Sequence, residues 1–379
     1  MKPPKKANVI YNYVRRGIET GKYHVGDRIP TERDLASQFE LSRPTVSSGI
    51  RRLVAERLLR RNGKAGSVVL AALPRRRLTF GAFLPMLGRP ERMESIFLTI
   101  GQELAHRAGL DHAAMLLRDP SWGDGPTDPD MGNRYREIAD QFMDHNVTGI
   151  FLTPQVILPD QYVSPSAQIA EDFKKARIAV VLIDSDIVRY PRRSAFDLVG
   201  IDNFSAGYAL ATHFLNLGCR KIDFLAKTAR HPTQQARIAG YQQAMADNGL
   251  PPDSAGVQYG DLHDEGFVRS TIRRRKPEVV LVLSDFRAVS VMRFILQAGL
   301  KIPQDIRLGS FDDLPLAAHL PVPLTTIRQP AVAIGMAAYQ LMVQRLAEPY
   351  RPPMHLQLTG ELVVRASSGV ALGSTGAAK

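Results

Sequence analysis

The stretch from residue 29 to residue 54, IPTERDLASQFELSRPTVSSGIRRLV, contains the signals for two short helices separated by a tight turn. Thr31 can cap the first helix, because its hydroxyl can accept a hydrogen bond from a backbone N–H of the first turn. Ser42 can cap the second helix, whose first turn tolerates Pro44. Apolar residues recur along the second helix at helical spacing and predict one buried stripe: Val46, Ile50, Leu53 and Val54.

The other faces of this second helix carry basic and hydroxyl side chains. They are Arg43, Thr45, Ser47, Ser48, Arg51 and Arg52. Two short helices, a tight turn and an exposed Arg/Ser/Thr face are typical of a helix-turn-helix, whose second helix enters the major groove of DNA. The same arginines could instead form a solvated face, pair with acids or contact only phosphates.

The residues on either side extend this pattern into a small module. Apolar spacing over 8–20 predicts a further helix before the stretch, with Gly21 ending it. After the stretch, 58–61 and 67–70 are two strand candidates, and Asn62-Gly63 between them is a strong hairpin signal. Lys64 makes this hairpin a basic wing. The fold class expected for residues 1–70 is therefore a winged helix-turn-helix.

The charge distribution supports a separate role for this module. Residues 1–78 hold 18 Lys and Arg against 6 Asp and Glu, whereas 79–379 hold 31 of each, so the first part carries the whole net charge of +12. A basic module joined to a large neutral one is typical of a DNA-binding domain with its own sensor. A membrane-surface patch would also be basic.

Other features of the whole chain limit its class. The only cysteine is Cys219, so no disulfide can form within one chain. The basic N-terminus lacks the apolar core of a signal peptide, and no apolar run is long enough to span a membrane. We therefore expect a cytoplasmic protein.

The neutral part alternates between short apolar runs and helical patterns. The runs lie at 80–84, 149–153, 178–184, 198–202, 221–226, 279–285 and 306–312. Strands that alternate with helices predict parallel α/β layers, and nearly 300 residues suggest two lobes. We expect a linker at 71–78, a two-lobed domain at 79–368 and a tail at 369–379. The loop 119–133, which contains Trp122, could be a lid or an insertion.

Three aspartates follow apolar strand runs: Asp184, Asp285 and Asp312. In open α/β sheets, ligands bind outside the carboxyl ends of the strands. Carboxylates there can accept hydrogen bonds from the vicinal hydroxyls of a sugar. Each aspartate could instead merely cap the helix that follows it.

The N-terminal module resembles the winged helix-turn-helix of the GntR family. The matching residues include GDRIPTERDLA at 26–36 and LSRPTV at 41–46. The resemblance implies DNA contacts by Arg33, Arg43, Thr45 and the wing residues Gly63 and Lys64. Ser47 is also a candidate contact, but family members often carry Arg there. Guanine recognition by a bidentate arginine would then be lost at that position.

The neutral part resembles the LacI/GalR-type sensor, which is itself similar to periplasmic sugar-binding proteins. The resemblance rests on VGIDN at 199–203, RIAGY at 237–241, FDD at 311–313 and PLTTIRQ at 323–329. It implies ligand contacts by five residues: Asp184, Arg237, Ser284, Asp285 and Asp312. Departures include Ser284, where Asn is frequent, and Leu262, where an aromatic often stacks on the sugar.

Together the two resemblances describe an arabinose-repressor type of architecture. They imply a repressor controlled by a small polar effector such as a sugar or sugar derivative, acting as a homodimer on a palindromic DNA operator. The three aspartates leave open a carbohydrate-processing enzyme, and a DNA-binding protein without a ligand is a third possibility. The scattered histidines show no metal-binding spacing, so we expect neither metal nor cofactor.

Overall fold

The structure is a computed structural model, and it describes residues 7–19, 21–62, 66–71, 78–85, 95–119, 131–154, 165–228, 231–250 and 256–369. The chain divides into two compact units. One comprises Met1–Leu78 with Val343–Arg351, and the other comprises Thr79–Met342 with Pro352–Lys379. The expected linker and tail lie largely outside the described residues, as does most of the loop 119–133, so those predicted boundaries stay predictions.

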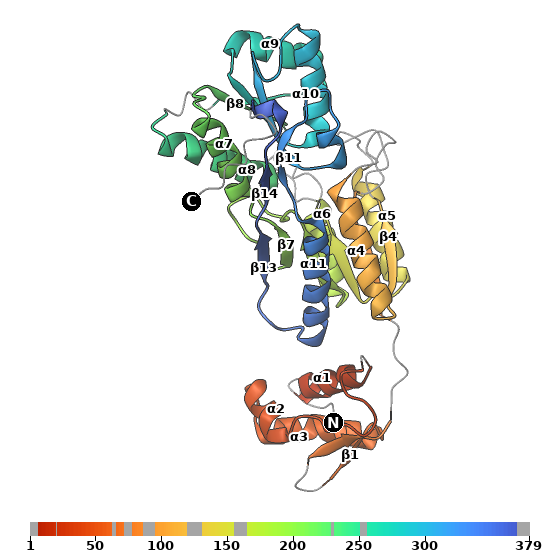
Figure 1. The fold of residues 1–379 in the computed structure, drawn as a ribbon. Helices are drawn as coiled ribbons and strands as arrows, with labels where there is room; N and C mark the ends of the chain where they lie inside the picture. The colour runs from red at the N-terminus through yellow and green to blue at the C-terminus, as the bar shows by residue number, and fades with distance from the viewer. Residues whose placement is uncertain are drawn as a thin grey trace. The chain divides into compact units, whose positions relative to one another are not determined.

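The N-terminal unit contains the helices and wing strands expected from its sequence (Figure 1). Its elements are α1 (Ala7–Glu19), α2 (Glu32–Gln38), α3 (Arg43–Ala55), β1 (Leu59–Arg61) and β2 (Ser67–Val69). The two strands pair antiparallel, with Leu59 opposite Val69 and Arg61 opposite Ser67. Thr31 forms a full capping box with Asp34, which fixes where α2 begins.

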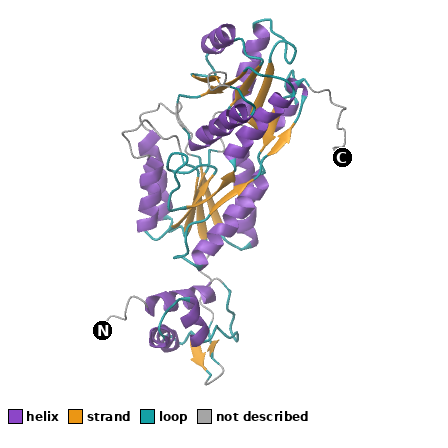
Figure 2. Cartoon of the chain, turned by 90° about the vertical axis from the view of Figure 1, so that its left-hand side faces the viewer, coloured by secondary structure: helices purple, strands orange, loops and turns teal. Residues whose placement is uncertain are grey.

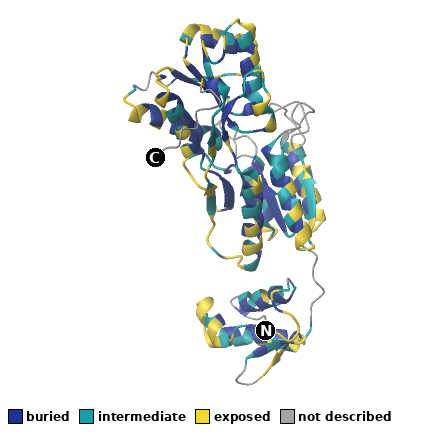
Figure 3. Cartoon of the chain, in the orientation of Figure 1, coloured by how far each residue is buried: buried dark blue, intermediate teal, exposed yellow. Residues whose placement is uncertain are grey.

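The core of this unit joins the inner faces of all three helices to the wing (Figure 3). Its fully buried members include Ile10, Val14, Leu35, Val46, Ile50 and Leu53. The predicted apolar stripe of α3 therefore faces α1 and α2, apart from Val54, which is only partly buried. Ser42 precedes α3, but its hydroxyl contacts the Thr45 hydroxyl at 2.8 Å and makes no cap bond to the backbone.

The second unit contains two six-stranded sheets, each flanked by helices (Figure 2). The first lobe has the strand order β13-β7-β6-β5-β3-β4, and all its neighbouring strands are parallel. Its elements are β3 (Thr79–Phe83), α4 (Ile96–Leu110), β4 (Ala114–Arg118), α5 (Met131–Asp144), β5 (Gly149–Leu152), α6 (Pro165–Lys175), β6 (Ala179–Ile183), β7 (Asp197–Ile201), α11 (Ala331–Ala347) and β13 (His355–Leu358).

The second lobe has the order β14-β12-β11-β10-β8-β9, and only its edge strand β14 is antiparallel. Its elements are α7 (Asn203–Asn216), β8 (Ile222–Ala226), α8 (Pro232–Asp247), β9 (Gly256–Tyr259), α9 (Glu265–Arg275), β10 (Val279–Val282), α10 (Asp285–Gln297), β11 (Arg307–Asp312), β12 (Thr325–Arg328) and β14 (Glu361–Val363), with short 3₁₀ turns at Pro315–Ala318 and Ala366–Ser368. The prediction of parallel α/β layers in two lobes is confirmed.

The chain passes between the two lobes three times. It crosses after β7, between β12 and α11, and between β13 and β14. Because both sheets are parallel, the carboxyl ends of their strands gather at one edge of each sheet. The first crossing leads from β7 directly into α7, and α7 packs closely on α8. Gly207 makes this possible, since a Cβ there would lie 2.0 Å from the Arg237 carbonyl oxygen.

Candidate functional sites

Helix α3 carries three of the six residues that the sequence singled out for DNA binding: Arg43, Thr45 and Ser47. Arg43 opens the helix and is exposed, as is Arg33 on α2, whereas Thr45 and Ser47 are partly buried. Gly63 and Lys64 lie outside the described residues. Arg52 turns inward instead: its guanidinium donates to the Asn8 side chain at 2.6 Å and stacks 3.9 Å from the Tyr11 ring centroid.

Ser47 has a partner that the sequence did not indicate. Its hydroxyl accepts a hydrogen bond of 2.9 Å from the Arg61 guanidinium, which also pairs with Glu32 at 2.7 Å. The three residues belong to α3, β1 and α2. They are distant in sequence, and no periodicity links them.

In the second unit, Arg237 stands in the first half of α8 and is almost fully buried. Its Nε donates to the Asn203 side-chain oxygen at 2.7 Å, and its Nη1 donates to the Leu283 carbonyl at 2.6 Å. Its guanidinium lies 4.5 Å from the Phe311 ring centroid. These contacts hold the plane of the guanidinium and leave Nη2 directed toward Asp312, 3.9 Å away.

Asp312 ends β11 beside this guanidinium. Its carboxylate accepts a 2.7 Å hydrogen bond from the Gln329 amide, and its side chain is 16% exposed. Burial raises the pKa of Asp312 to about 7, against the opposing effect of Arg237; Asp285 and Asp184 add to the rise. The pKa shift means that this carboxyl group can hold or release a proton near neutral pH.

Asp184 follows β6 in the first lobe and lines a cavity of about 260 Å³. Residues of both lobes line that cavity, among them Tyr190, Asn203, Thr233 and Gln357. The Asp184 Oδ1 is buried without a hydrogen-bond partner among the described residues. Burial raises the pKa of Asp184, and Arg237 opposes the rise. An unsatisfied buried acceptor at a cavity wall is suited to a ligand donor.

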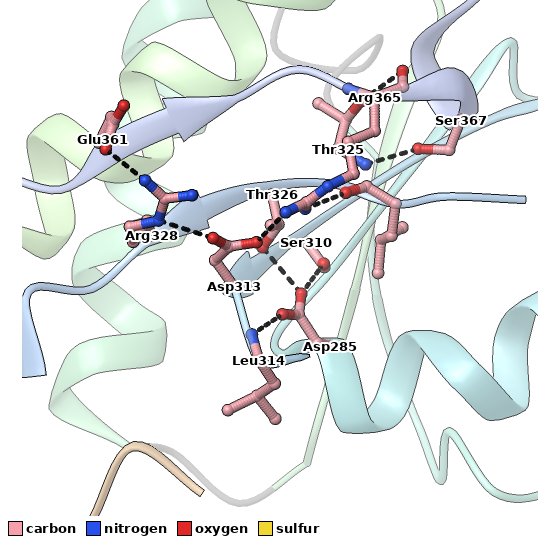
Figure 4. Close-up of polar contacts among 11 residues, drawn as sticks. Asp285, Ser310, Asp313, Leu314, Thr325, Thr326, Arg328, Glu361, Arg365 and Ser367 are labelled. Atoms are coloured by element: carbon pink, nitrogen blue, oxygen red, sulfur yellow. Dashed lines mark hydrogen bonds and ion pairs between the residues drawn. The ribbon is translucent and has the colours of Figure 1, made fainter. Parts of the chain in front are cut away.

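Asp285 differs from these two aspartates because its carboxylate is fully engaged within its lobe (Figure 4). Oδ1 accepts hydrogen bonds from the Ser310 and Thr326 hydroxyls, and Oδ2 accepts one from the Leu314 N–H at 2.8 Å. The group therefore joins α10 to β11, β12 and the loop after β11. This geometry favours a positioning role over the ligand contact predicted for Asp285.

Asp313 extends the same network (Figure 4). Its carboxylate pairs with Arg328 at 2.7 Å and with Arg365 at 2.6 Å, and Arg328 also pairs with Glu361 at 2.9 Å. These contacts tie β11, β12 and β14 together. Ser284 immediately precedes α10 and is partly buried, and its hydroxyl makes no cap bond.

The backbone is strained at three of these aspartates. Asp184 has a φ of 68°, Asp312 of 113° and Asp313 of 53°. Non-glycine residues rarely adopt positive φ, and such strain concentrates at functional sites. The network of Asp285 and Asp313 supplies the contacts that hold the end of β11 in this conformation.

His231 lies between β8 and α8, immediately before the first residue of α8. Burial lowers the pKa of His231 to about 4, and the nearby cations Lys227, Arg287 and Arg237 lower it further. The imidazole is therefore neutral at pH 7. Leu262, the residue in the expected stacking position, is fully buried. Like Arg237 and Asp312, it is not among the residues that line the cavity beside Asp184.

The sequence predictions thus separate into two groups. The structure places Arg237 3.9 Å from Asp312, and Asp184 is near enough for its charge to raise the pKa of Asp312, whereas Asp285 faces into its lobe. Sequence reasoning missed Asn203 and Gln329, which orient Arg237 and Asp312. Gln329 directly follows β12 and Asn203 lies two residues after β7, so the strand-end rule that selected the aspartates could have found both.

Two further features, a membrane-spanning helix and a cluster of metal ligands, are absent from the part of the chain that the structure describes. There, no helix is long and apolar enough to cross a membrane. The same residues contain no group of three or more His, Cys, Asp or Glu side chains that could hold a metal ion.

Two family models match the chain. Residues 6–69 match the bacterial regulatory proteins of the gntR family, and residues 211–368 match the periplasmic binding protein-like domain. The chain thus joins a GntR-type helix-turn-helix domain to a periplasmic-binding-protein-like domain, which confirms the combination expected from the sequence.

Curated relatives are named as transcriptional regulators. The HTH-type transcriptional repressor PurR of Photobacterium profundum is 26% identical over 51% of this chain and 58% of its own length. The ribose operon repressor of Escherichia coli is 33% identical over 44% of this chain and 52% of its own length. The chain thus spans little more than half of these relatives. The HTH-type transcriptional regulator MalR of Streptomyces coelicolor is 27% identical over 90% of this chain and 98% of its own length.

Solved structures share the fold. The transcription regulator CcpA of Lactococcus lactis has a TM-score of 0.64 at 21% identity, covering 77% of this chain and 99% of that protein. A complex of the transcriptional regulator CelR with cellobiose has a TM-score of 0.64 at 18% identity, covering 89% of this chain and 100% of that protein. At these identities the likeness shows the fold alone.

Proposed function

We propose that this chain is a DNA-binding transcriptional repressor whose affinity for DNA is controlled by a small polar effector, a sugar or sugar derivative. The single observation that carries the proposal is the arrangement of Arg237. Its guanidinium is held by Asn203 and Leu283 and faces Asp312 in a two-lobed domain, while the same chain carries a separate helix-turn-helix.

The chemistry of the pocket suits a polyhydroxylated ligand. Arg237 offers N–H donors, while Asp184 and Asp312 offer acceptors for hydroxyl groups. Buried polar groups of both kinds discriminate strongly, since a ligand lacking the matching group leaves them unpaired. The names of one relative and one solved complex, which mention ribose and cellobiose, support a sugar-like effector.

Control of DNA binding would follow from the two-lobed construction. An effector that binds better when the lobes are closed shifts the population toward that state. In a homodimer, this shift changes the relative placement of the two helix-turn-helix domains, which must match both half-sites of a palindromic operator. Arg33, Arg43, Thr45 and Ser47, with the wing residues Gly63 and Lys64, would contact that operator.

A carbohydrate-processing enzyme would need two available carboxyl groups flanking the substrate. Asp285 is engaged by three hydrogen-bond donors, so Asp184 and Asp312 are the remaining pair among the three strand-end aspartates. Sugar turnover that Asp312→Asn abolishes would favour the enzyme over the repressor.

The test begins with selection of an operator from a random DNA library by the full chain. A thermal-shift screen with sugars and sugar acids then identifies an effector, and a gel shift measures operator binding with and without it. The proposal predicts an enriched palindrome whose binding the effector changes. Failure to enrich any sequence, or an effector that leaves binding unchanged, would refute it.

A point variant tests the helix that reads DNA. Arg43→Ala should weaken operator binding by about 5- to 150-fold, corresponding to the loss of about 1–3 kcal/mol for a base contact. The effector's thermal shift should stay the same. Arg273→Ala, an exposed arginine on α9, removes the same charge and should leave operator affinity unchanged. Equal operator affinity for Arg43→Ala and the parent would contradict the choice of α3.

A further inference from the structure

Arg61 joins three elements of the N-terminal unit through one end of its side chain. Its Nη2 donates to the Glu32 carboxylate of α2 at 2.7 Å and to the Ser47 hydroxyl of α3 at 2.9 Å. Arg61 itself is the last residue of β1. The guanidinium therefore lies on the polar side of α3, although it does not belong to that helix.

The fold fixes where this guanidinium can lie. Leu59, two residues earlier in β1, is almost fully buried in the core and anchors the strand. Arg61 pairs across the wing with Ser67, which is also buried. On the other side, the capping box of Thr31 fixes the first turn of α2, where Glu32 stands. Both ends of the Arg61–Glu32 pair are therefore attached to rigid backbone.

The pair has the properties of an orienting contact. The side chains of Arg61 and Glu32 are 45% and 35% exposed, and ion pairs this exposed contribute little to stability. Within the described residues, Arg61 bonds Glu32 and Ser47 through Nη2, which leaves Nε and Nη1 to face a ligand. A guanidinium presents its donors in a planar fork that matches two acceptors side by side.

Ser47 places this fork on the surface that the proposed function assigns to DNA. It lies about one turn along α3 from Arg43, and its short hydroxyl supports the guanidinium. The pair of acceptors that best suits an arginine fork in the major groove is O6 and N7 of guanine. Because the long side chain is already held in place before binding, less conformational entropy is lost when DNA binds.

We infer that Arg61 reads a guanine in each operator half-site, with Glu32 and Ser47 as the residues that position its guanidinium. This inference rests on the proposed function. It supplies an arginine for the position where α3 itself offers only serine. Strand β1 thereby supplies the arginine fork that α3 lacks at Ser47.

The experiment compares specificity as well as affinity. The full chain first selects an operator, and binding is then measured for that operator and for every single-base variant of it. Arg61→Ala should bind the operator with about 10- to 100-fold lower affinity. It should also no longer distinguish the four bases at one G·C pair in each half-site. Arg61→Lys keeps the charge but lacks the fork, so it should lose the same discrimination.

Matched variants separate base reading from simple charge. Arg60→Ala removes the neighbouring exposed arginine of β1 and should weaken all sequences by one common factor, if it changes binding at all. Ser47→Ala and Glu32→Gln should each reduce discrimination at the same base pair that Arg61 reads. In the background of Arg61→Ala they should have no further effect at that pair.

Several results would overturn the inference. A uniform loss across all sequences for Arg61→Ala would mean that the guanidinium contacts only phosphate. Unchanged base preference for both Arg61→Ala and Arg61→Lys, with folding verified by circular dichroism, would also refute it while leaving the proposed function intact. Failure of the parent chain to enrich any sequence would overturn both.

Discussion

Replacing Asp285 by alanine is expected to destabilise the second unit while sparing the N-terminal unit. The carboxylate accepts hydrogen bonds from Ser310, Thr326 and the Leu314 N–H, all at positions buried from solvent. Alanine removes the acceptor of all three donors. They belong to β11, β12 and the loop between them, so the loss reaches the strands that carry the end of the pocket.

The magnitude follows from the number of donors. Leaving a buried donor without a partner costs about 1–3 kcal/mol, so three donors together cost roughly 3–9 kcal/mol. Removing the carboxylate offsets part of this cost, because burial raises the pKa of Asp285 to about 6 and its ionised form is disfavoured. A net loss of about 4 kcal/mol is therefore expected.

Asparagine provides a graded comparison at the same position. Its side-chain oxygen can still accept from Ser310 and Thr326, but its NH₂ group then faces the Leu314 N–H. One interaction is lost instead of three, so Asp285→Asn should cost about 1–3 kcal/mol. Alanine should therefore be clearly more disruptive than asparagine.

Differential scanning calorimetry of the full chain measures this effect. For a unit of this size, about 4 kcal/mol should lower the transition temperature of the second unit by roughly 8–16 °C. The transition of the N-terminal unit serves as an internal reference. A change of less than about 1 kcal/mol in Asp285→Ala, together with loss of the effector's thermal shift, would refute the positioning role and favour a direct ligand contact.

Two further predictions follow from the pocket and from the α7–α8 contact. The pKa of Asp312 is raised to about 7, so as pH rises from about 4 to 7 the unfolded chain ionises this group before the folded chain does, and stability falls. In thermal melts, Asp312→Asn should have the same free energy of unfolding as the parent near pH 4 and a higher one, by up to about 4 kcal/mol, at pH 8. An equal difference between the two proteins at both pH values would contradict this. Gly207→Ala should cost about 3 kcal/mol or more, because the new Cβ would overlap the Arg237 carbonyl, whereas Gly109→Ala on α4 meets no atom within 4 Å and should be neutral or stabilising. Similar melting temperatures for the two glycine variants would show that α7 and α8 can separate at little cost.

Local signals in the sequence account for much of the fold. The capping residue Thr31, the apolar stripe of α3 and the alternating strands and helices each depend on neighbours within a few residues. Gly218, Gly249 and Gly299 follow helices with positive φ, a conformation that favours glycine at helix ends. Such features are predictable because helix and strand periodicity express themselves over a single turn or hairpin.

The carboxylates show where local signals stop. Asp184, Asp285 and Asp312 all follow apolar strands, and nothing in their immediate sequence distinguishes them. Their roles diverge because Asp285 meets Ser310 and Thr326 from adjacent strands, whereas the Asp184 Oδ1 meets no donor in the described part of the chain. Hydrogen-bond satisfaction depends on which strands are neighbours in the sheet, and the parallel crossovers set that order.

By itself, the sequence determined that a basic helix-turn-helix precedes a neutral α/β sensor, because charge and periodicity are properties of short stretches. Only the tertiary structure decided which arginine accompanies Ser47. Arg61 is 14 residues away and belongs to a strand, so its contact with α3 arises from the way β1 packs beside the helices. Side chains that meet across elements are fixed by packing, and packing depends on the whole core of the unit.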